Sequence, residues 1–176
     1  MTKLYSSSSI ADNNELHLLT RYPSQLKLYL EWSANAKPEW GSVTNFIIKN
    51  RLHWETASPE SCQPDSLFEV VNPEPLSDPA DYKILVNDWP YGLDKDIFHL
   101  IVWSKHKLPA TPEKGDLTSQ GRSLLEGFVE SKFRSKLGAD DVLWFRNWTG
   151  LQSVRSLEHF HVLVRHGKGR IDEILQ

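Results

Sequence analysis

The chain has 176 residues, with 20 lysines and arginines against 23 aspartates and glutamates, and a net charge of −3. That length suits one compact domain, and the near-neutral charge gives no whole-chain reason to expect nucleic acid or an anionic membrane as a partner. The single cysteine excludes a disulfide-stapled secreted scaffold. No apolar run approaches the roughly 20 residues of a membrane-spanning helix, and the chain starts without a secretory signal. We therefore expect a cytoplasmic protein.

Residues 1–54 are predicted to be an N-terminal helical elaboration of two or three short helices. Leucines recur there at intervals of three and four residues, as they do along one face of a helix. Pro23 suits a first helical turn, whereas Pro38 and Gly41 interrupt the pattern. Ser42 is placed to cap the helix that follows.

Residues 55–81 are predicted to be a connection over the surface. They hold five of the ten prolines, together with several serines and aspartates. Such a composition excludes a long helix or a central strand, because proline lacks the N–H group that both need. The short apolar patch Leu67–Val71 leaves room for one edge strand.

Residues 82–176 are predicted to form the core of the molecule. Apolar residues lie on one helical face from Leu124 to Leu137, and Gly138 follows as a stop signal. Strand patterns precede and follow this helix, at residues 82–86, 97–103, 142–145 and 158–164. The order strand, strand, helix, strand, strand predicts an α+β fold, in which the helix covers an antiparallel sheet.

Two histidines on the last predicted strand form the sharpest local feature. Side chains alternate along a strand, so His159 and His161 face the same way, about 6.6 Å apart along the chain. One explanation is a pair of buried, hydrogen-bonded side chains. A second is a neutral imidazole that attacks phosphorus or carbon, oriented by its neighbour. A third is a metal site, with His99, His106 or a carboxylate as a further ligand.

The loop before this strand is rich in hydrogen-bond donors. Asn147, Thr149, Gln152 and Ser153 carry short polar side chains, and Gly150 lets backbone N–H groups approach a phosphate closely. A polar turn between strands is the simpler explanation. However, a donor-rich loop that leads directly into a two-histidine strand is the arrangement that phosphoryl or acyl transfer needs.

Seven tryptophans are unusual for this length and must pack a core or line a ligand site. Trp32 lies in the predicted helical part and is most simply a packing anchor. Trp89 and Trp148 lie in the turn and the loop where we place the site, so we expect them to wall a base or sugar pocket. Packing of either one on the core is the alternative.

Four strings follow one another in the second half of the chain: His99-Leu-Ile-Val-Trp-Ser-Lys-His106, Trp144-Phe-Arg-Asn147, Gln152-Ser153-Val154 and His159-Phe-His161-Val162. In this order, they resemble the histidine-triad (HIT) superfamily of nucleotide hydrolases and transferases. The resemblance covers residues 82 to 165 and implies a HIT-like sheet.

The resemblance also implies roles for single residues. His159 would be the nucleophile that attacks the α-phosphate of a nucleotide or nucleotide-sugar, and His161 would be the last histidine of the motif. The residues that would contact phosphate are Asn147, Gln152 and Ser153. Leu157 stands where the superfamily has its first histidine, so the proton-handling part of catalysis is not supplied there.

A second resemblance covers nearly the whole chain. The strings that carry it are Tyr29-Leu-Glu-Trp32, Gly41-Ser-Val-Thr-Asn-Phe-Ile47, Arg51-Leu-His-Trp54, Asn87-Asp-Trp-Pro-Tyr-Gly92, His99-Leu-Ile-Val-Trp103, Trp144-Phe-Arg-Asn-Trp148 and Ser156-Leu-Glu-His-Phe-His-Val162. They resemble a fungal family named N-acetylglucosamine-induced protein 1, and the resemblance implies a fungal cytosolic protein linked to amino-sugar metabolism, without supplying a catalytic residue.

Three functional hypotheses follow. The first is a HIT-like hydrolase or transferase that acts on a nucleotide or nucleotide-sugar through His159, with His161, His99 and the loop residues around the ligand. The second is a non-catalytic protein that binds a nucleotide or amino sugar and regulates a response to N-acetylglucosamine. The third is a metal-dependent hydrolase with His159 and His161 as ligands. The expected partner is a small phosphorylated molecule, without a cofactor, and the sequence leaves a homodimer open.

Overall fold

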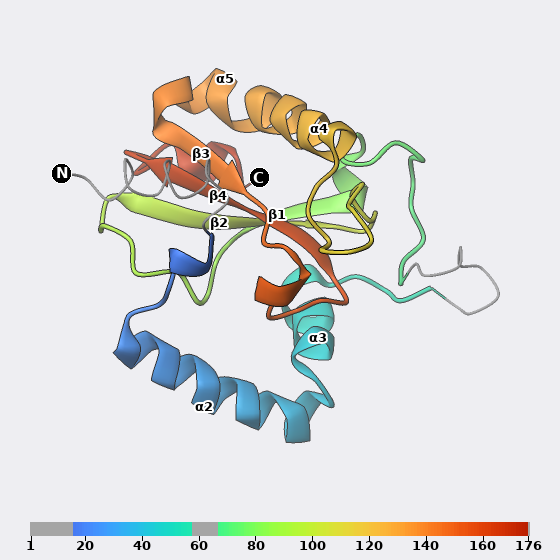
Figure 1. The fold of residues 1–176 in the computed structure, drawn as a ribbon, viewed down its shortest axis with the longest axis vertical. Helices are drawn as coiled ribbons and strands as arrows, with labels where there is room; N and C mark the ends of the chain where they lie inside the picture. Colours follow the sequence, from blue (N-terminus) through green and yellow to red (C-terminus); the bar gives the residue numbers. More distant parts are fainter. Residues whose placement is uncertain (1–15, 58–66, 176) are drawn as a thin grey trace.

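The computed structural model describes residues 16–57 and 67–175. It is an α+β structure built on one four-stranded antiparallel sheet with the strand order β1-β2-β4-β3 (Figure 1). Helices lie on both faces of this sheet, with α4 and α5 on one side and α2 and α3 on the other. The α+β prediction is thus confirmed.

The four strands coincide with the four predicted ones. Their bounds are β1 Tyr82–Val86, β2 Ile97–Ser104, β3 Val142–Phe145 and β4 Glu158–Arg165. β1 and β2 pair as an antiparallel hairpin, and β4 lies between β2 and β3. Because both of its edges are paired, β4 is a central strand, and six of its eight residues are buried.

The predicted helix covers one face of the sheet. α4 (Ser119–Val129) continues through a π-helical segment (Glu130–Arg134) into α5 (Ser135–Leu137), and the helix ends at Gly138, whose φ is 97°. Its apolar face packs on alternate residues of the two central strands. This main core includes Leu100, Val102, Leu125, Phe128, Val129, Phe133, Phe160, Val162 and Val164.

The N-terminal helical part covers the opposite face. α2 runs from Pro23 to Trp40, so the helix is interrupted at Gly41, as expected, but not at Pro38. Pro38 lacks the N–H group that would donate to the carbonyl of Ala34, so the helix gives up that one hydrogen bond and continues to Gly41, whose N–H group donates to the carbonyl of Lys37 at 2.8 Å.

A short helix and a π-helical turn follow α2. α3 (Val43–Phe46) begins after Ser42, whose hydroxyl accepts a hydrogen bond from the N–H group of Asn45, as predicted for a cap. The chain then continues as a π-helical turn over Ile47–Leu52, which packs on β1 and β2 through Ile47, Ile48 and Leu52.

The end of the proline-rich connection is fixed by a buried carboxylate. Asp81 is fully buried and accepts hydrogen bonds from the N–H groups of Val71 and Asn72. Burial alone raises its pKa, but these hydrogen bonds and the nearby Lys105 outweigh burial, so the pKa of Asp81 is lowered. The described part of Leu67–Val71 contains no strand, so the expected edge strand is not formed.

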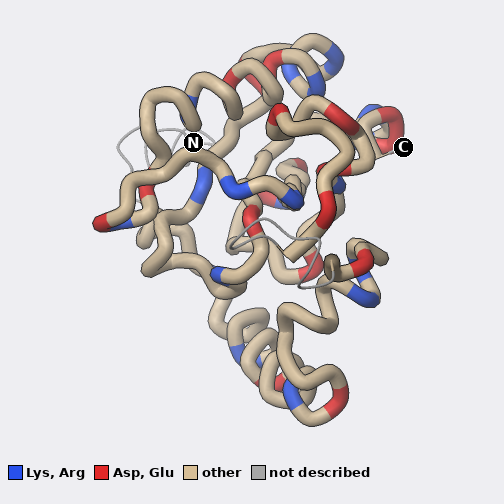
Figure 2. Tube along the Cα trace, turned by 90° about the vertical axis from the view of Figure 1, so that its right-hand side faces the viewer, with Lys and Arg blue, Asp and Glu red and all other residues tan. Residues whose placement is uncertain are grey.

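Acidic and basic residues alternate over the side of the molecule drawn in Figure 2, and both signs occur on the helical segment at the bottom of that view. In residues 16–57 and 67–175, we find no helix whose length and apolar character would let it cross a bilayer.

Candidate functional site

The candidate site lies on the sheet face that α2 and α3 cover. On β4, His159 and His161 point to this face, whereas Phe160 points to the core beneath α4. The strand register places Trp103 of β2 opposite His159, and Ile101 opposite His161. The two imidazole rings are 5.5 Å apart between centroids, as their same-face spacing predicts.

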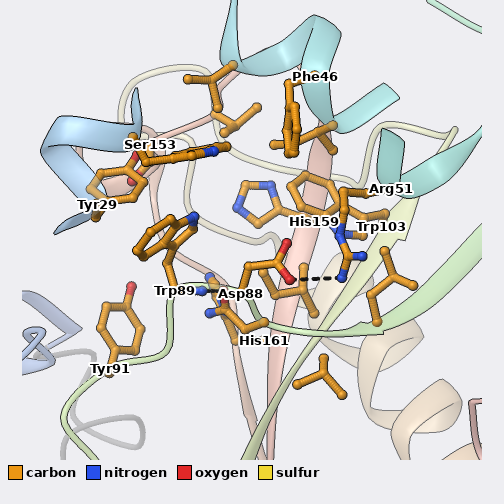
Figure 3. Close-up of a pocket in the computed structure, with 18 of the residues that line it drawn as sticks. Tyr29, Phe46, Arg51, Asp88, Trp89, Tyr91, Trp103, Ser153, His159 and His161 are labelled. Carbon is orange, nitrogen blue, oxygen red and sulfur yellow. Dashed lines mark hydrogen bonds and ion pairs between the residues drawn. The ribbon is translucent and has the colours of Figure 1, made fainter. Parts of the chain in front are cut away.

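A cavity separates the sheet from the N-terminal helices. Figure 3 shows the ring of His159 near its centre, with Trp103 beside it and Phe46 above. Aromatic side chains of α2 and of the loop after β1 form another wall, namely Tyr29, Trp32, Trp89 and Tyr91. The volume open to a water-sized sphere is about 80 Å³, which is room for roughly five to eight such spheres, or one ring-sized group.

His159 is held in one tautomer and is neutral. Its Nδ1 lies 2.8 Å from the carbonyl oxygen of Leu157, so Nδ1–H donates to that oxygen. Burial lowers the pKa of His159, because desolvation disfavours the charged imidazolium; Arg146 acts in the same direction, and the carbonyl and Glu158 oppose it. Nε2 therefore carries a lone pair, and no other described residue forms a hydrogen bond with that nitrogen.

A chain of polar groups runs beside His159. Nε2 of His99 lies 2.9 Å from Nδ1 of His161, and Nε2 of His161 lies 3.3 Å from the side-chain amide nitrogen of Asn147. The same amide nitrogen lies 3.0 Å from the hydroxyl oxygen of Tyr91. These side chains come from β2, β4 and two loops, so the fold brings together groups that are up to 70 residues apart.

His99 and His161, the two histidines in this row of polar groups, are neutral as well. Burial, together with the positive charge of Arg21, lowers the pKa of His99 to about 3. Burial also holds the pKa of His161 well below the ordinary value, with His99, His159 and Arg21 adding to the effect. The site therefore presents uncharged imidazoles at neutral pH.

Positive charge is supplied at the cavity wall by two arginines. The guanidinium of Arg21 lies 4.4 Å from the ring centroid of Tyr29, and its Nε donates to the carbonyl of Trp89 at 3.1 Å. Arg51 forms an ion pair with Asp88, with 2.9 Å between nitrogen and oxygen (Figure 3). Both arginines line the cavity, as does Asp88, whose negative charge lies beside Arg51.

The loop between β3 and β4 is anchored by a second ion pair. Nε of Arg146 lies 2.6 Å from Oε1 of Glu158, both side chains are largely buried, and Nη1 of Arg146 donates to the carbonyl of Gly115. These contacts therefore tie the start of β4 to the loop after β3 and to the loop before α4, and so fix the approach of the chain to His159.

Sequence reasoning placed nine residues at the site, and the structure brings most of them together. Five of these residues line the cavity: His159, His161, Asn147, Ser153 and Trp89. His99 lies behind this wall, against His161.

The other three lie outside the cavity lining. Gln152 donates through its side-chain amide to the carbonyl of Asn147, and so supports the loop from behind. Gly150 packs near the indole of Trp148. Trp148 packs on a small apolar cluster with Leu16 and Phe145.

Sequence reasoning missed the N-terminal contribution to the cavity. Tyr29, Trp32 and Phe46 wall it, and Trp32 also packs on Phe46 and Trp89, with 5.2 and 5.3 Å between ring centroids, as expected of a packing anchor. Arg21 and Arg51 were not predicted to lie at the site. The available signal was the pair of aromatic residues three positions apart on one helix, Tyr29 and Trp32, but the same spacing is also typical of a core-facing helix.

The hydrogen bonds do not favour the histidine pair as metal ligands. Both ring nitrogens of His161 face other side chains, and Nδ1 of His159 is bound to Leu157. His106, an expected further ligand, lies near Asp81, with 3.7 Å between nitrogen and oxygen. In the described part of the chain, no three His, Cys, Asp or Glu residues are grouped to hold a metal ion.

Comparisons with known proteins match most of the chain. N-acetylglucosamine-induced protein 1 of Candida albicans is 30% identical, over 94% of this chain and 69% of that protein. The uncharacterized protein YPL067C of Saccharomyces cerevisiae is 28% identical, over 88% of this chain and 74% of that protein. The crystal structure of HTC1 has a TM-score of 0.74 and 27% identity, over 95% of this chain and 91% of that one.

The fungal resemblance seen in the sequence is thus confirmed, and the fold is shared with a solved structure. A family model described as a protein of unknown function, DUF3605, matches residues 5–165, which include the whole sheet and every residue of the cavity. The chain therefore belongs to the DUF3605 family.

Proposed function

We propose that this protein is a HIT-like hydrolase or transferase that acts at the phosphate of a nucleotide or nucleotide-sugar, with His159 as the nucleophile. The observation that carries the proposal is the 2.8 Å hydrogen bond from Nδ1–H of His159 to the carbonyl of Leu157. It fixes the tautomer and leaves the lone pair of Nε2 on the cavity side. A neutral imidazole held in this way is an activated nucleophile.

The proposed reaction has two balanced steps. In the first, the Nε2 lone pair forms a bond to phosphorus, the bond from phosphorus to the leaving oxygen breaks, and that oxygen leaves with the electron pair. The imidazole becomes a phosphorylated cation, which the hydrogen bond from Nδ1–H to the carbonyl of Leu157 stabilises. In the second, water attacks phosphorus, the electron pair of the N–P bond returns to Nε2, and the proton of the attacking water passes to solvent.

The cavity walls suit a ligand with one flat ring and an anionic group. Trp32, Trp89 and Tyr29 offer faces on which a base or sugar ring stacks, and stacking of a base on an aromatic side chain contributes about 1–3 kcal/mol. Arg21 supplies positive charge for phosphate, whereas the charge of Arg51 is offset by its ion pair with Asp88. Since the volume suits one ring, a larger ligand such as a nucleotide-sugar extends beyond the cavity.

The surroundings of His159 also narrow the choice of leaving group. Leu157 is 2% exposed and packs in an apolar cluster, so it supplies no proton. Both nitrogens of His161 are engaged by other side chains. We therefore propose a phosphoanhydride substrate, because phosphate oxygens leave as stable anions without a general acid.

The buried Leu157 also favours a second candidate, a ligand-binding protein without catalysis on the same site. The curated relative from Candida albicans is named for induction by N-acetylglucosamine. A nucleotide derivative of that sugar, UDP-N-acetylglucosamine, is accordingly the first ligand to test for both candidates.

The test compares turnover with binding. Wild-type protein, His159→Ala and the matched control His17→Ala, which changes an exposed histidine outside the cavity, are incubated with UDP-N-acetylglucosamine and diadenosine polyphosphates, and products are separated by chromatography. The proposal expects turnover by the wild type and the control, and a loss of at least a hundredfold in His159→Ala. Equal rates for all three proteins would eliminate His159 as nucleophile. Binding without turnover would support the second candidate.

A further inference from the structure

The hydrogen bonds in the polar chain beside His159 all run in one direction, which is set by the contacts of His99. Nδ1 of His99 lies 3.3 Å from the backbone N–H group of Tyr91. The side-chain amide nitrogen of Asn87 lies 3.3 Å from both ring nitrogens of His99, so it does not distinguish them. The N–H group of Tyr91 can only donate, so Nδ1 of His99 must be an acceptor.

The tautomer of the next histidine follows from this. A neutral imidazole carries one proton, so His99 carries it on Nε2 and donates it to Nδ1 of His161 at 2.9 Å. His161 is neutral for the same reason of burial, and it therefore carries its own proton on Nε2. Its Nε2–H must donate to an acceptor. The atom within reach is the side-chain amide atom of Asn147 that lies 3.3 Å from Nε2.

Only one atom of that amide is able to accept. An asparagine presents either its oxygen or its nitrogen at a given place by a half-turn about its last bond, and the hydrogen-bond network decides between them. With oxygen at this place, Asn147 accepts from Nε2–H of His161 and from the hydroxyl of Tyr91, which lies 3.0 Å away. With nitrogen there, two donors face each other.

We infer that His99 is a positioning residue, which fixes the direction of this hydrogen-bond chain so that Asn147 turns its amide N–H groups toward the ligand cavity. Asn147 lines that cavity, together with His159. The group on offer there is then a donor, which suits an oxyanion such as a phosphoryl oxygen and repels a cation. The role in ligand binding rests on the proposed function, whereas the direction of the chain does not.

The direction is measurable without any ligand. Long-range proton–nitrogen NMR correlations distinguish the two neutral tautomers of each imidazole, and single substitutions assign the signals. We expect the Nε2–H tautomer for His99 and His161 and the Nδ1–H tautomer for His159. An Nδ1–H tautomer for His161 in the wild-type protein would overturn the inference. This measurement needs no variant of uncertain stability, because assignment can rest on whichever substitutions fold.

Two variants separate positioning from packing. His99→Phe removes the donor and keeps a ring between Tyr91 and Phe145, which both pack near His99, so His161 should lose its single tautomer. Asn147→Asp keeps an oxygen that accepts from His161 and removes the amide N–H groups. We expect this variant to preserve the Nε2–H tautomer of His161. If the amide of Asn147 instead donated to His161, the tautomer of His161 would have to change in this variant.

The ligand arm uses AMP as the probe, titrated calorimetrically against the wild-type protein and Asn147→Asp. We expect the dissociation constant to rise at least tenfold in the variant. An unchanged dissociation constant would refute the donor role of Asn147. If the tautomers are as inferred and the wild-type protein binds neither AMP nor UDP-N-acetylglucosamine, the proposed function fails while the direction of the hydrogen-bond chain stands.

Discussion

Acidification should destabilise this protein well above the pH at which carboxylates protonate, because its site buries neutral histidines. The pKa of His99 falls from 6.5 to about 3 on folding, through burial and the charge of Arg21. The unfolded chain therefore binds a proton at pH 5 that the folded chain does not. Since the folded pKa is the lower one, stability is lost as the pH falls through 6.5, and the loss continues down to about pH 3.

The size of this loss follows from the two pKa values. At pH 5 the unfolded state gains about 2 kcal/mol from protonation of His99 alone, at 1.36 kcal/mol for each pKa unit. His159 and His161, whose pKa values are also lowered by burial, act in the same direction. A domain of this size is typically stable by about 5–15 kcal/mol, so a substantial fraction is lost by pH 5.

The assay is urea unfolding between pH 8 and pH 5, with His99→Phe as the comparison. The lowered pKa values of Asp81 and Glu126 affect stability mainly at still lower pH, so they do not obscure this window. We expect the decline in unfolding free energy from pH 8 to pH 5 to be about 2 kcal/mol smaller in His99→Phe than in the wild type. Parallel declines in the two proteins, or a flat wild-type curve, would refute the reasoning.

Three further predictions concern binding and packing. Trp32→Ala should weaken AMP binding by roughly 5- to 150-fold, as the loss of one stacking partner, whereas Trp148→Ala should lower the melting temperature and leave the dissociation constant almost unchanged. Arg146→Ala should cost about 3–5 kcal/mol in unfolding free energy, because it leaves Glu158 buried without its partner. Phe160→Ala should cost about 3–5 kcal/mol by opening a hole between the sheet and α4, measured by urea unfolding.

Each of these has a result that would contradict it. Equal dissociation constants for Trp32→Ala and the wild type would remove the α2 wall from the ligand site. A double variant that replaces both Arg146 and Glu158 with apolar residues should recover stability relative to Arg146→Ala, and its failure to do so would place the cost elsewhere. A loss below 1 kcal/mol in the unfolding free energy of Phe160→Ala would mean that neighbouring core side chains fill the space of the deleted ring.

The sheet and its covering helix were predictable because their patterns are local. Alternation along residues 158–164 and apolar spacing from Leu124 to Leu137 each specify one element and its buried face. The order of elements then favours the α+β arrangement. The length of α2 was not predictable in this way, since Pro38 removes only the one hydrogen bond that its own N–H group would donate to the carbonyl of Ala34, and the helix continues to Trp40.

Only the part of the site that the sheet and its neighbouring loop contribute was predictable from the sequence. Alternation places His159 and His161 on one face, and the neighbouring loop brings Asn147 close, because these residues lie within 15 positions of one another. The partners across the cavity are more than 100 residues away in sequence. The spacing of Tyr29 and Trp32 does not reveal whether the aromatic face of their helix meets apolar side chains or an open cavity. Aromatic residues at this spacing suit either environment.

The walls of the cavity come from two distant parts of the chain, residues 21–51 and residues 85–161. Such a cavity exists only while the N-terminal helices are docked on the sheet, so a bound ligand would hold the two parts together. In hydrogen-exchange experiments, a ligand of this site should therefore slow exchange in α2 and α3 more than in β4, whose amides are already protected by strands on both sides.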